Sequence, residues 1–156
     1  MGLTADILYA KDILTNAQIP HAKIIGTLSC KQLAGLRDTE FLIDSGATKT
    51  TISPFQAVVF LSIDTDHLPT APNACSIVNG TNIRPKMLQE VELRINKRDG
   101  KPNSEWIFVL PYILVMPVHK SKPLVKANSL LGMDVLRNFP NWQWDFANNF
   151  LYLNEH

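Results

Sequence analysis

The chain has 156 residues, of which 46% are hydrophobic and 19% charged, and its formal net charge is +1. This length suits one domain around one core, and the composition is too apolar for a disordered chain. A net charge this close to zero gives no field that attracts nucleic acid or an anionic membrane. The sequence therefore predicts a globular domain without a nucleic-acid or membrane partner.

Cysteine and histidine usage predicts neither a disulfide framework nor a metal site. Cys30 and Cys75 are the only cysteines and lie in no zinc-ligand pattern, and the four histidines show no metal-binding spacing. We expect free thiols, no metal and no cofactor. The N-terminus lacks the features of a secretory signal, and the longest apolar stretch, residues 106–118, is too short for a bilayer and contains two prolines. These features predict a cytoplasmic protein.

The first half of the chain predicts short strands and one short helix. Residues 1–21 suit a helix about as well as a packed extended arm, so the predicted domain is 22–156 with an N-terminal arm of uncertain structure. Residues 22–28 and 39–44 are plausible strands. Ser53-Pro54 is typical of a helix N-cap followed by proline at the first helical position, and predicts a helix through about Phe60.

The middle of the chain carries two strand signals. Asn79-Gly80 is the strongest short hairpin signal, because both central residues of a type I′ turn need positive φ, and it lies between residues 75–78 and 81–83. Residues 87–95 alternate between apolar and charged side chains, which predicts a half-buried strand.

The last third predicts further strands and a second short helix. Residues 106–109 and 113–115 extend the sheet, and residues 133–139 have helical character that ends at Pro140. Residues 142–146 and 150–153 predict a final hairpin. The fold class is therefore all-β, mainly β with two short helices, and not a βαβ protein.

The segment with chemical content is residues 41–48, which read Phe-Leu-Ile-Asp-Ser-Gly-Ala-Thr. A carboxylate at the end of an apolar strand is costly to bury unless donors or a shared proton compensate for it. Gly46 allows a tight turn and a close approach of another backbone, and Ser45 places a hydroxyl beside Asp44. Asp-Ser-Gly is also ordinary turn chemistry, so the tetrapeptide alone does not establish a site.

A second segment changes this assessment. Residues 129–136 read Ser-Leu-Leu-Gly-Met-Asp-Val-Leu, two apolar residues and a glycine that enter a helix. Together the two segments resemble those of the retropepsins, the retroviral-type aspartic peptidases and their cellular and microbial relatives. The resemblance covers roughly Ala22 to Leu153. It implies the closed β-barrel of a retropepsin-like acid protease, and an aspartic endopeptidase that acts on polypeptide as a homodimer.

The resemblance also implies roles for particular residues. Asp44 is the expected catalytic aspartate, Ser45 the hydroxyl that ties the two active-site loops together across a dimer, and Gly46 the glycine that completes the signature. Leu131-Gly132 is expected to pack behind this loop. The hairpin is expected to be the flap that closes over substrate, with its tip and pocket liners at Ile77, Val78, Asn79, Gly80, Thr81 and Ile83.

The chemistry requires two carboxylates, and the sequence offers one credible candidate. Ile63-Asp64-Thr65-Asp66 has an aspartate where the signature needs glycine and predicts a solvent-facing turn. Asp134 is expected to be an early-helix acid, and Asp145 a polar residue of a strand or hairpin. The second catalytic aspartate is therefore expected from another copy of the chain, related by a two-fold axis.

Two other functions fit the same residues. The fold can serve as a catalytically weak or inactive module that binds a peptide or protein, or as a structural barrel in which Asp44 is a satisfied turn residue. Trp106, Trp142 and Trp144 resemble a ligand box, but core or interface packing is the expected use of such large rings.

Overall fold

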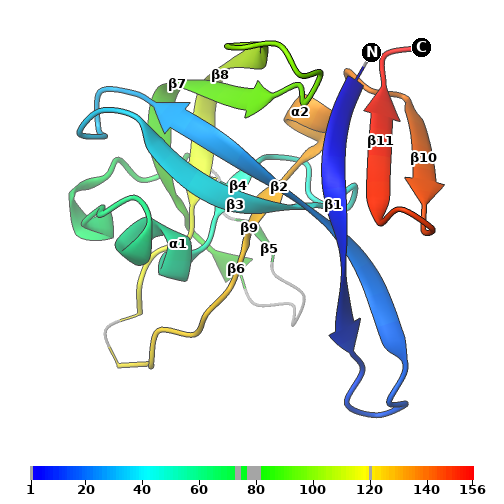
Figure 1. The fold of residues 1–156 in the computed structure, drawn as a ribbon. Helices are drawn as coiled ribbons and strands as arrows, with labels where there is room; N and C mark the ends of the chain where they lie inside the picture. Colours follow the sequence, from blue (N-terminus) through cyan, green and yellow to red (C-terminus); the bar gives the residue numbers. More distant parts are fainter. Residues whose placement is uncertain (1, 73–74, 77–81, 120) are drawn as a thin grey trace.

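The chain folds mainly as β-structure, as seen in a computed structural model that describes residues 2–72, 75–76, 82–119 and 121–156 (Figure 1). A main sheet and a small hairpin account for the strands. The strands are β1 (Gly2–Lys11), β2 (Gln18–Ser29), β3 (Arg37–Ile43), β4 (Thr51–Ile52), β5 (Cys75–Ser76), β6 (Asn82–Ile83), β7 (Lys86–Asn96), β8 (Glu105–Val115), β9 (Ser129–Leu131), β10 (Asn141–Asp145) and β11 (Phe150–Asn154). The helices are α1 (Pro54–Val59), the 3-10 helix η1 (Thr65–His67) and α2 (Met133–Leu136).

The main sheet closes on itself. Its strand order is β10-β11-β1-β2-β3-β9-β4-β8-β7, and β7 also pairs with β2 through Thr27↔Arg94, Leu28↔Leu93 and Ser29↔Glu92. Strands β2, β3, β9, β4, β8 and β7 therefore form a closed barrel, which removes their free edges. The predicted fold class, a mainly β closed barrel with two short α-helices, is confirmed for the described residues.

The barrel interior is filled by aliphatic and aromatic side chains from alternate strand positions. Leu28, Phe41, Leu93, Ile113 and Leu131 are all fully buried. The fit is close at Gly26, where an added Cβ would lie 2.6 Å from Leu93 Cδ1. Among the described residues no helix is long and apolar enough to cross a membrane.

The N-terminal residues form a strand of the main sheet. Gly2 to Asp6 in β1 pair antiparallel with β11, and Leu3, Ala5 and Ile7 are buried. Asp6 also accepts two hydrogen bonds from the guanidinium of Arg98, at 2.8 and 2.7 Å, which lower the pKa of its carboxyl. The alternative between helix and extended arm is thus settled in favour of an extended strand.

Several predicted elements have different bounds in the structure. Helix α2 ends at Leu136 instead of Phe139, and turn hydrogen bonds such as Phe139 N to Leu136 O follow it. Pro140 disfavours the α conformation only at Phe139, the residue that precedes it. The two strands expected around Pro111 are one strand, β8. The predicted N-cap of α1 is confirmed, since Ser53 Oγ accepts from Gln56 N at 3.1 Å.

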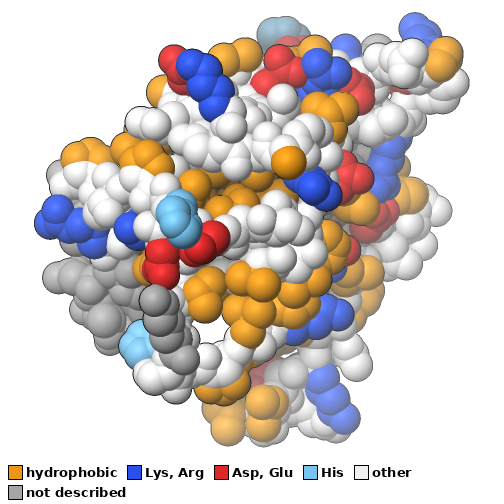
Figure 2. Space-filling model, turned by 90° about the vertical axis from the view of Figure 1, so that its left-hand side faces the viewer, with side chains coloured by type: hydrophobic (Ala, Val, Ile, Leu, Met, Phe, Trp, Pro, Cys, Tyr) orange, Lys and Arg blue, Asp and Glu red, His pale blue; other side chains and the backbone are white. Residues whose placement is uncertain are grey.

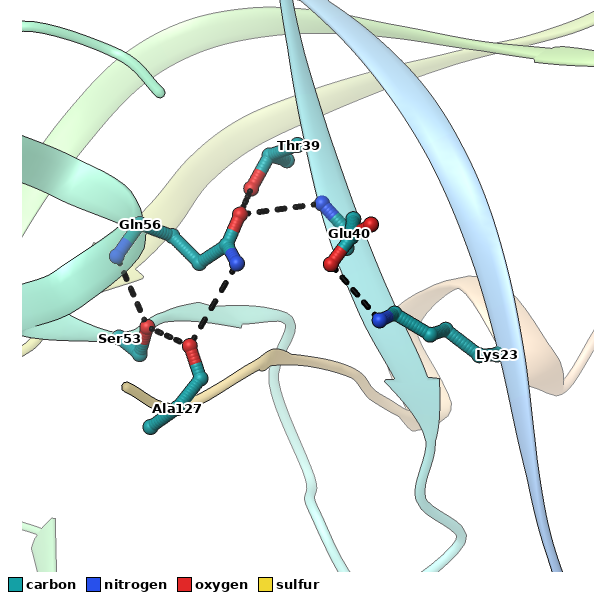
Figure 3. Close-up of polar contacts among 6 residues, drawn as sticks. All are labelled: Lys23, Thr39, Glu40, Ser53, Gln56 and Ala127. Carbon is teal, nitrogen blue, oxygen red and sulfur yellow. Dashed lines mark hydrogen bonds and ion pairs between the residues drawn. The ribbon is translucent and has the colours of Figure 1, made fainter. Parts of the chain in front are cut away.

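One buried side chain replaces a missing strand beside β3. Strand β9 pairs with β3 only from Phe41 to Ile43. Gln56 of α1 accepts hydrogen bonds from the two residues before Phe41 (Figure 3). Gln56 is 1% exposed, and its Oε1 accepts from Thr39 Oγ1 at 2.8 Å and from Glu40 N at 3.2 Å. Its Nε2 donates to Ala127 O at 3.5 Å. This network ties α1, β3 and the segment before β9 together.

Gln56→Leu removes that network while keeping the approximate volume of the side chain. We expect the free energy of unfolding to fall by about 2–4 kcal/mol, because Thr39 and Glu40 each lose a buried acceptor. Urea unfolding of the variant beside wild type measures this loss. Gln143→Leu, at an exposed position of β10, is the matched control and should change stability by less than about 0.5 kcal/mol. Equal stability of the two variants would contradict the role of Gln56.

Candidate active site

Asp44 lies immediately after β3, where that strand runs parallel to β9. The paired part of β3 and β9 ends at Ile43 and Leu131. The backbone N–H of Asp44 adds one further hydrogen bond, to Leu131 O at 3.1 Å. The residue is half-buried, and its neighbours Ser45 and Gly46 are exposed. The apolar strand thus ends in a carboxylate at the molecular surface.

The turn after β3 orients this carboxylate. Gly46 N donates to Asp44 Oδ1 at 2.8 Å, and Ala47 N donates to Asp44 O at 3.2 Å. A Cβ on Gly46 would lie 3.1 Å from the same Oδ1, so glycine permits the close approach. No other hydrogen bond to the Asp44 carboxylate, and none to the Ser45 hydroxyl, comes from the described residues. Asp44 Oδ2 is not among the buried atoms and Ser45 is exposed, so one carboxylate oxygen and one hydroxyl are accessible to a group outside the turn.

The rest of the turn is docked on the start of α2. The first amides of a helix lack partners within it, and α2 has no side-chain cap at Gly132. Met133 N donates instead to Ala47 O at 2.8 Å, and Asp134 N donates to Thr48 O at 3.2 Å. The turn and the helix end satisfy each other's main-chain groups.

Thr50 and Asp134 lock this contact. Thr50 is fully buried, and its hydroxyl donates to Asp134 Oδ1 at 2.7 Å and accepts from Gly132 N at 3.2 Å. Thr50 N donates to both oxygens of the same carboxylate at 3.0 Å. A Cβ on Gly132 would lie 2.5 Å from Lys49 C, so only glycine allows the two backbones to approach this closely. The expectation that Leu131-Gly132 packs behind the loop is confirmed.

The other acidic candidates lie in structural turns. Asp64 caps η1 by accepting from Asp66 N at 3.0 Å, and it contacts His67 Nδ1 at 2.8 Å. Asp145 ends β10, and hydrogen bonds from Asn148 lower the pKa of its carboxyl. Both sites agree with the turn and hairpin positions predicted for them. Within the described ranges, no group of three or more His, Cys, Asp or Glu side chains is placed to hold a metal ion.

The predicted flap lies largely outside the described residues. This applies to Ile77, Val78, Asn79, Gly80 and Thr81, and to the side chain of Ile83. The flanking main chain forms the β5–β6 ladder, which pairs Cys75 with Ile83 and Ser76 with Asn82. An uninterrupted hairpin with a two-residue turn at positions 79–80 would pair Ser76 with Ile83 instead, so the observed register is displaced by one residue from that expectation.

The tryptophans do not form a ligand box. Trp106 packs edge-on against Phe139 with ring centroids 5.2 Å apart, and Trp142 Nε1 donates to Phe139 O at 2.6 Å. Trp144 lies on the edge strand β10, where it stacks on Phe146. The two half-buried rings support the core, as expected, and Trp144 is exposed.

A separate apolar face carries α1. Val58, Val59 and Phe60 are exposed there, and Figure 2 shows hydrophobic side chains gathered on this side of the molecule next to acidic ones. A hollow beside α1 and η1 is lined by Val58, Ile63, Asp64, Thr65, Asp66 and Val118. Neither Asp44, Ser45 nor Gly46 lines this hollow, so it is distinct from the Asp44 turn.

Sequence reasoning missed the partner of Asp134. The residue was expected to interact with the helix dipole, and it does lie in the first turn of α2, but its carboxylate mainly binds Thr50. The contact of Lys49 with Tyr112 was also not predicted. The Lys49 ammonium lies 5.1 Å from the centre of the Tyr112 ring. The signal for Thr50 was weak, because a buried threonine after a turn looks like any other strand residue.

Comparison with known proteins gives a structural likeness of low sequence identity and no sequence match. No protein-family model matches the chain, and no curated protein matches its sequence. Among solved structures, the chain is similar to a retropepsin-like aspartic protease from Rickettsia conorii, with 19% sequence identity and a TM-score of 0.49. The likeness covers 98% of this chain and 94% of that chain. These values are too low to assign the chain to that family.

Thr50→Val tests whether the lock holds the Asp44 turn. Valine keeps the shape but leaves Gly132 N without its acceptor and removes a donor from Asp134. We expect a loss of about 1–3 kcal/mol in the free energy of unfolding, with faster hydrogen exchange at the amides of Gly46 and Ala47. Thr48→Val, at an exposed position of the same turn, is the control. Unchanged exchange in the Thr50 variant would show that the turn is held by other contacts.

Proposed function

We propose that the chain is an aspartic endopeptidase that hydrolyses peptide bonds as a homodimer, with a water activated between the two Asp44 carboxylates. The alternative is a catalytically weak or inactive retropepsin-like module that binds a peptide or protein. Polypeptide is the proposed substrate of the peptidase and the proposed ligand of the binding module. Asp44, Ser45 and Gly46 form the proposed site.

The carboxylate of Asp44, held by Gly46 N through one oxygen and accessible through the other, is the observation that carries the proposal. The turn is anchored at Leu131 on one side and on α2 on the other, which is more constraint than a plain connection needs. Preorganised groups are what catalysis requires, since they need not be oriented during the reaction. The closed barrel and the mainly β fold support the resemblance seen in the sequence.

The proposed chemistry depends on a second copy of Asp44. Two carboxylates a few ångströms apart cannot both ionise cheaply, so the pair shares one proton. The ionised member takes a proton from the water as its oxygen attacks the peptide carbonyl carbon, and the neutral member donates a hydrogen bond to the carbonyl oxygen. A proton then passes to the amide nitrogen as the carbon–nitrogen bond breaks, and no covalent enzyme intermediate forms.

Asp44→Asn tests this mechanism directly. We expect cleavage of a diverse peptide library at several pH values to fall by roughly 10²–10⁴-fold or more, because asparagine cannot accept the proton of the water. The far-ultraviolet circular dichroism and the dimer should be unchanged. Asp64→Asn, at the cap of η1, is the matched control and should cleave as wild type does. Full activity in the Asp44 variant would refute the mechanism.

The binding-module alternative predicts a different result in the same peptide assays. If wild-type dimer cleaves neither the peptide library nor itself, but binds peptides in a way that a hydroxyl-containing transition-state mimic competes with, the module is favoured. If the dimer neither cleaves nor binds peptide, both functions fail and the structural barrel remains.

Ser45→Ala addresses the proposed bridge between subunits. If the exposed hydroxyl bonds to the partner's turn, its removal should weaken dimerisation by about tenfold and lower activity at subunit concentrations near the dimer dissociation constant. Activity should recover as the concentration is raised. Sedimentation velocity and initial rates over the same concentration series measure both effects. Loss of activity with unchanged self-association would argue against a bridging role.

A further inference from the structure

The antiparallel ribbon formed by residues 8–21, here called the ribbon, makes its main-chain hydrogen bonds, among the described residues, only within itself. The ladder between β1 and β11 ends at Ile7, whose N–H donates to Asn149 O at 2.9 Å. The ladder between β2 and β3 begins only at Lys23. From Leu8↔His21 to Lys11↔Gln18 the two strands pair with each other. In Figure 1 the ribbon extends away from the barrel, toward the bottom of the view.

The ribbon presents apolar side chains to solvent. At its tip Ile13 is 97% exposed and Leu14 is 94% exposed, the two highest values among the large hydrophobic residues described. Leu8 and Ile19, on one face of the strands, are 43% and 48% exposed. Turn residues are normally polar, and contiguous exposed apolar groups mark interaction sites.

The tip is built to hold these side chains in place. Asp12 Oδ1 accepts from Leu14 N at 2.8 Å, and Asp12 O accepts from Asn16 N at 2.9 Å. Asp12 N donates to Ala17 O at 2.9 Å and closes the loop. An isolated two-stranded ribbon is only marginally stable, and its two open edges invite pairing with another chain. A partner that covers the ribbon accounts for both features.

The strand register identifies which partner fits. Lys23 of β2 pairs with Leu42 of β3. Because the strands are antiparallel, moving two residues back along β2 and two residues on from Leu42 places His21 level with Asp44. His21 in turn pairs with Leu8 of β1. The ribbon therefore starts at the level of the Asp44 turn and projects about 15 Å beyond it, at 3.3 Å per residue. A second copy whose Asp44 meets this Asp44 must lie next to the ribbon.

The size of a stable interface points to the same partner. A specific interface engages about 20–30 residues on each side, many more than the turn from Asp44 to Thr50 contains. The ribbon starts at the level of that turn and adds an apolar surface of the kind found at interface centres. We propose that the ribbon clasps a second copy of this chain, so that two ribbons related by a two-fold axis hold the paired Asp44 turns together. This inference rests on the proposed function, because the dimer is what brings two Asp44 side chains together.

Ile13→Asp/Leu14→Asp places two charges in the proposed contact. Both side chains are almost fully exposed within the subunit, so the fold should be unaffected by circular dichroism and thermal unfolding. We expect the dimer dissociation constant from sedimentation velocity to rise by about tenfold or more. Ile107→Asp/Val109→Asp adds the same charges to exposed apolar positions of β8 and should leave dimerisation unchanged. A tip variant that dimerises as wild type overturns the proposal.

Photo-crosslinking identifies the occupant independently of stability. With p-benzoylphenylalanine at position 14, irradiation of the dimer should give a covalent dimer, and the same group at position 109 should not. A crosslink to added peptide would make the ribbon a substrate lid, and a crosslink within one chain would make it a self-contact; either result overturns the clasp.

A wild-type protein that stays monomeric refutes the clasp and the dimeric mechanism together. A crosslinked dimer whose activity survives Asp44→Asn refutes the mechanism alone.

Discussion

The contact between the Asp44 turn and the start of α2 is the interaction on which the proposed site depends. One carboxylate, Asp134, binds the main chain and the hydroxyl of Thr50, and Gly132 lets the two backbones meet. A charge-assisted network of this kind is geometrically demanding because each group has a fixed partner. It couples residues more than 80 positions apart, so the position of the turn depends on the tertiary fold as well as on its local hydrogen bonds.

The closed barrel fits the proposal that the site is completed by a second copy of the chain. Strands β3 and β9 run parallel and end together, so the Asp44 turn and Gly132 meet at one end of the barrel. Pairing of β7 with β2 closes the circle and leaves no edge in the barrel for a second active-site strand. In the proposed mechanism the paired carboxylate comes from a second copy of the chain, which is why self-association and activity are linked in the proposal.

Sequence patterns predicted the elements whose signals are local. The alternation in β7, the Ser53 cap of α1 and the final hairpin all depend on neighbours in sequence, and the structure confirms them. Asp44 was singled out because a carboxylate after an apolar strand is unusual, and its expected catalytic role came from the resemblance that residues 41–48 and 129–136 carry together. The pairing of Thr50 with Asp134 and the replacement of a strand by Gln56 were not predictable, because each depends on which segments the barrel brings together.

The N-terminal residues show how one strand can serve two purposes. Half of β1 is fixed by β11 and buries Leu3, Ala5 and Ile7, so its removal would expose an apolar stripe of the sheet. The other half leaves the sheet and carries the exposed tip. A segment that could be discarded would not be expected to supply core residues. The first residues are therefore a structural strand of the main sheet, and the same strand continues into the ribbon that is proposed to clasp a second copy.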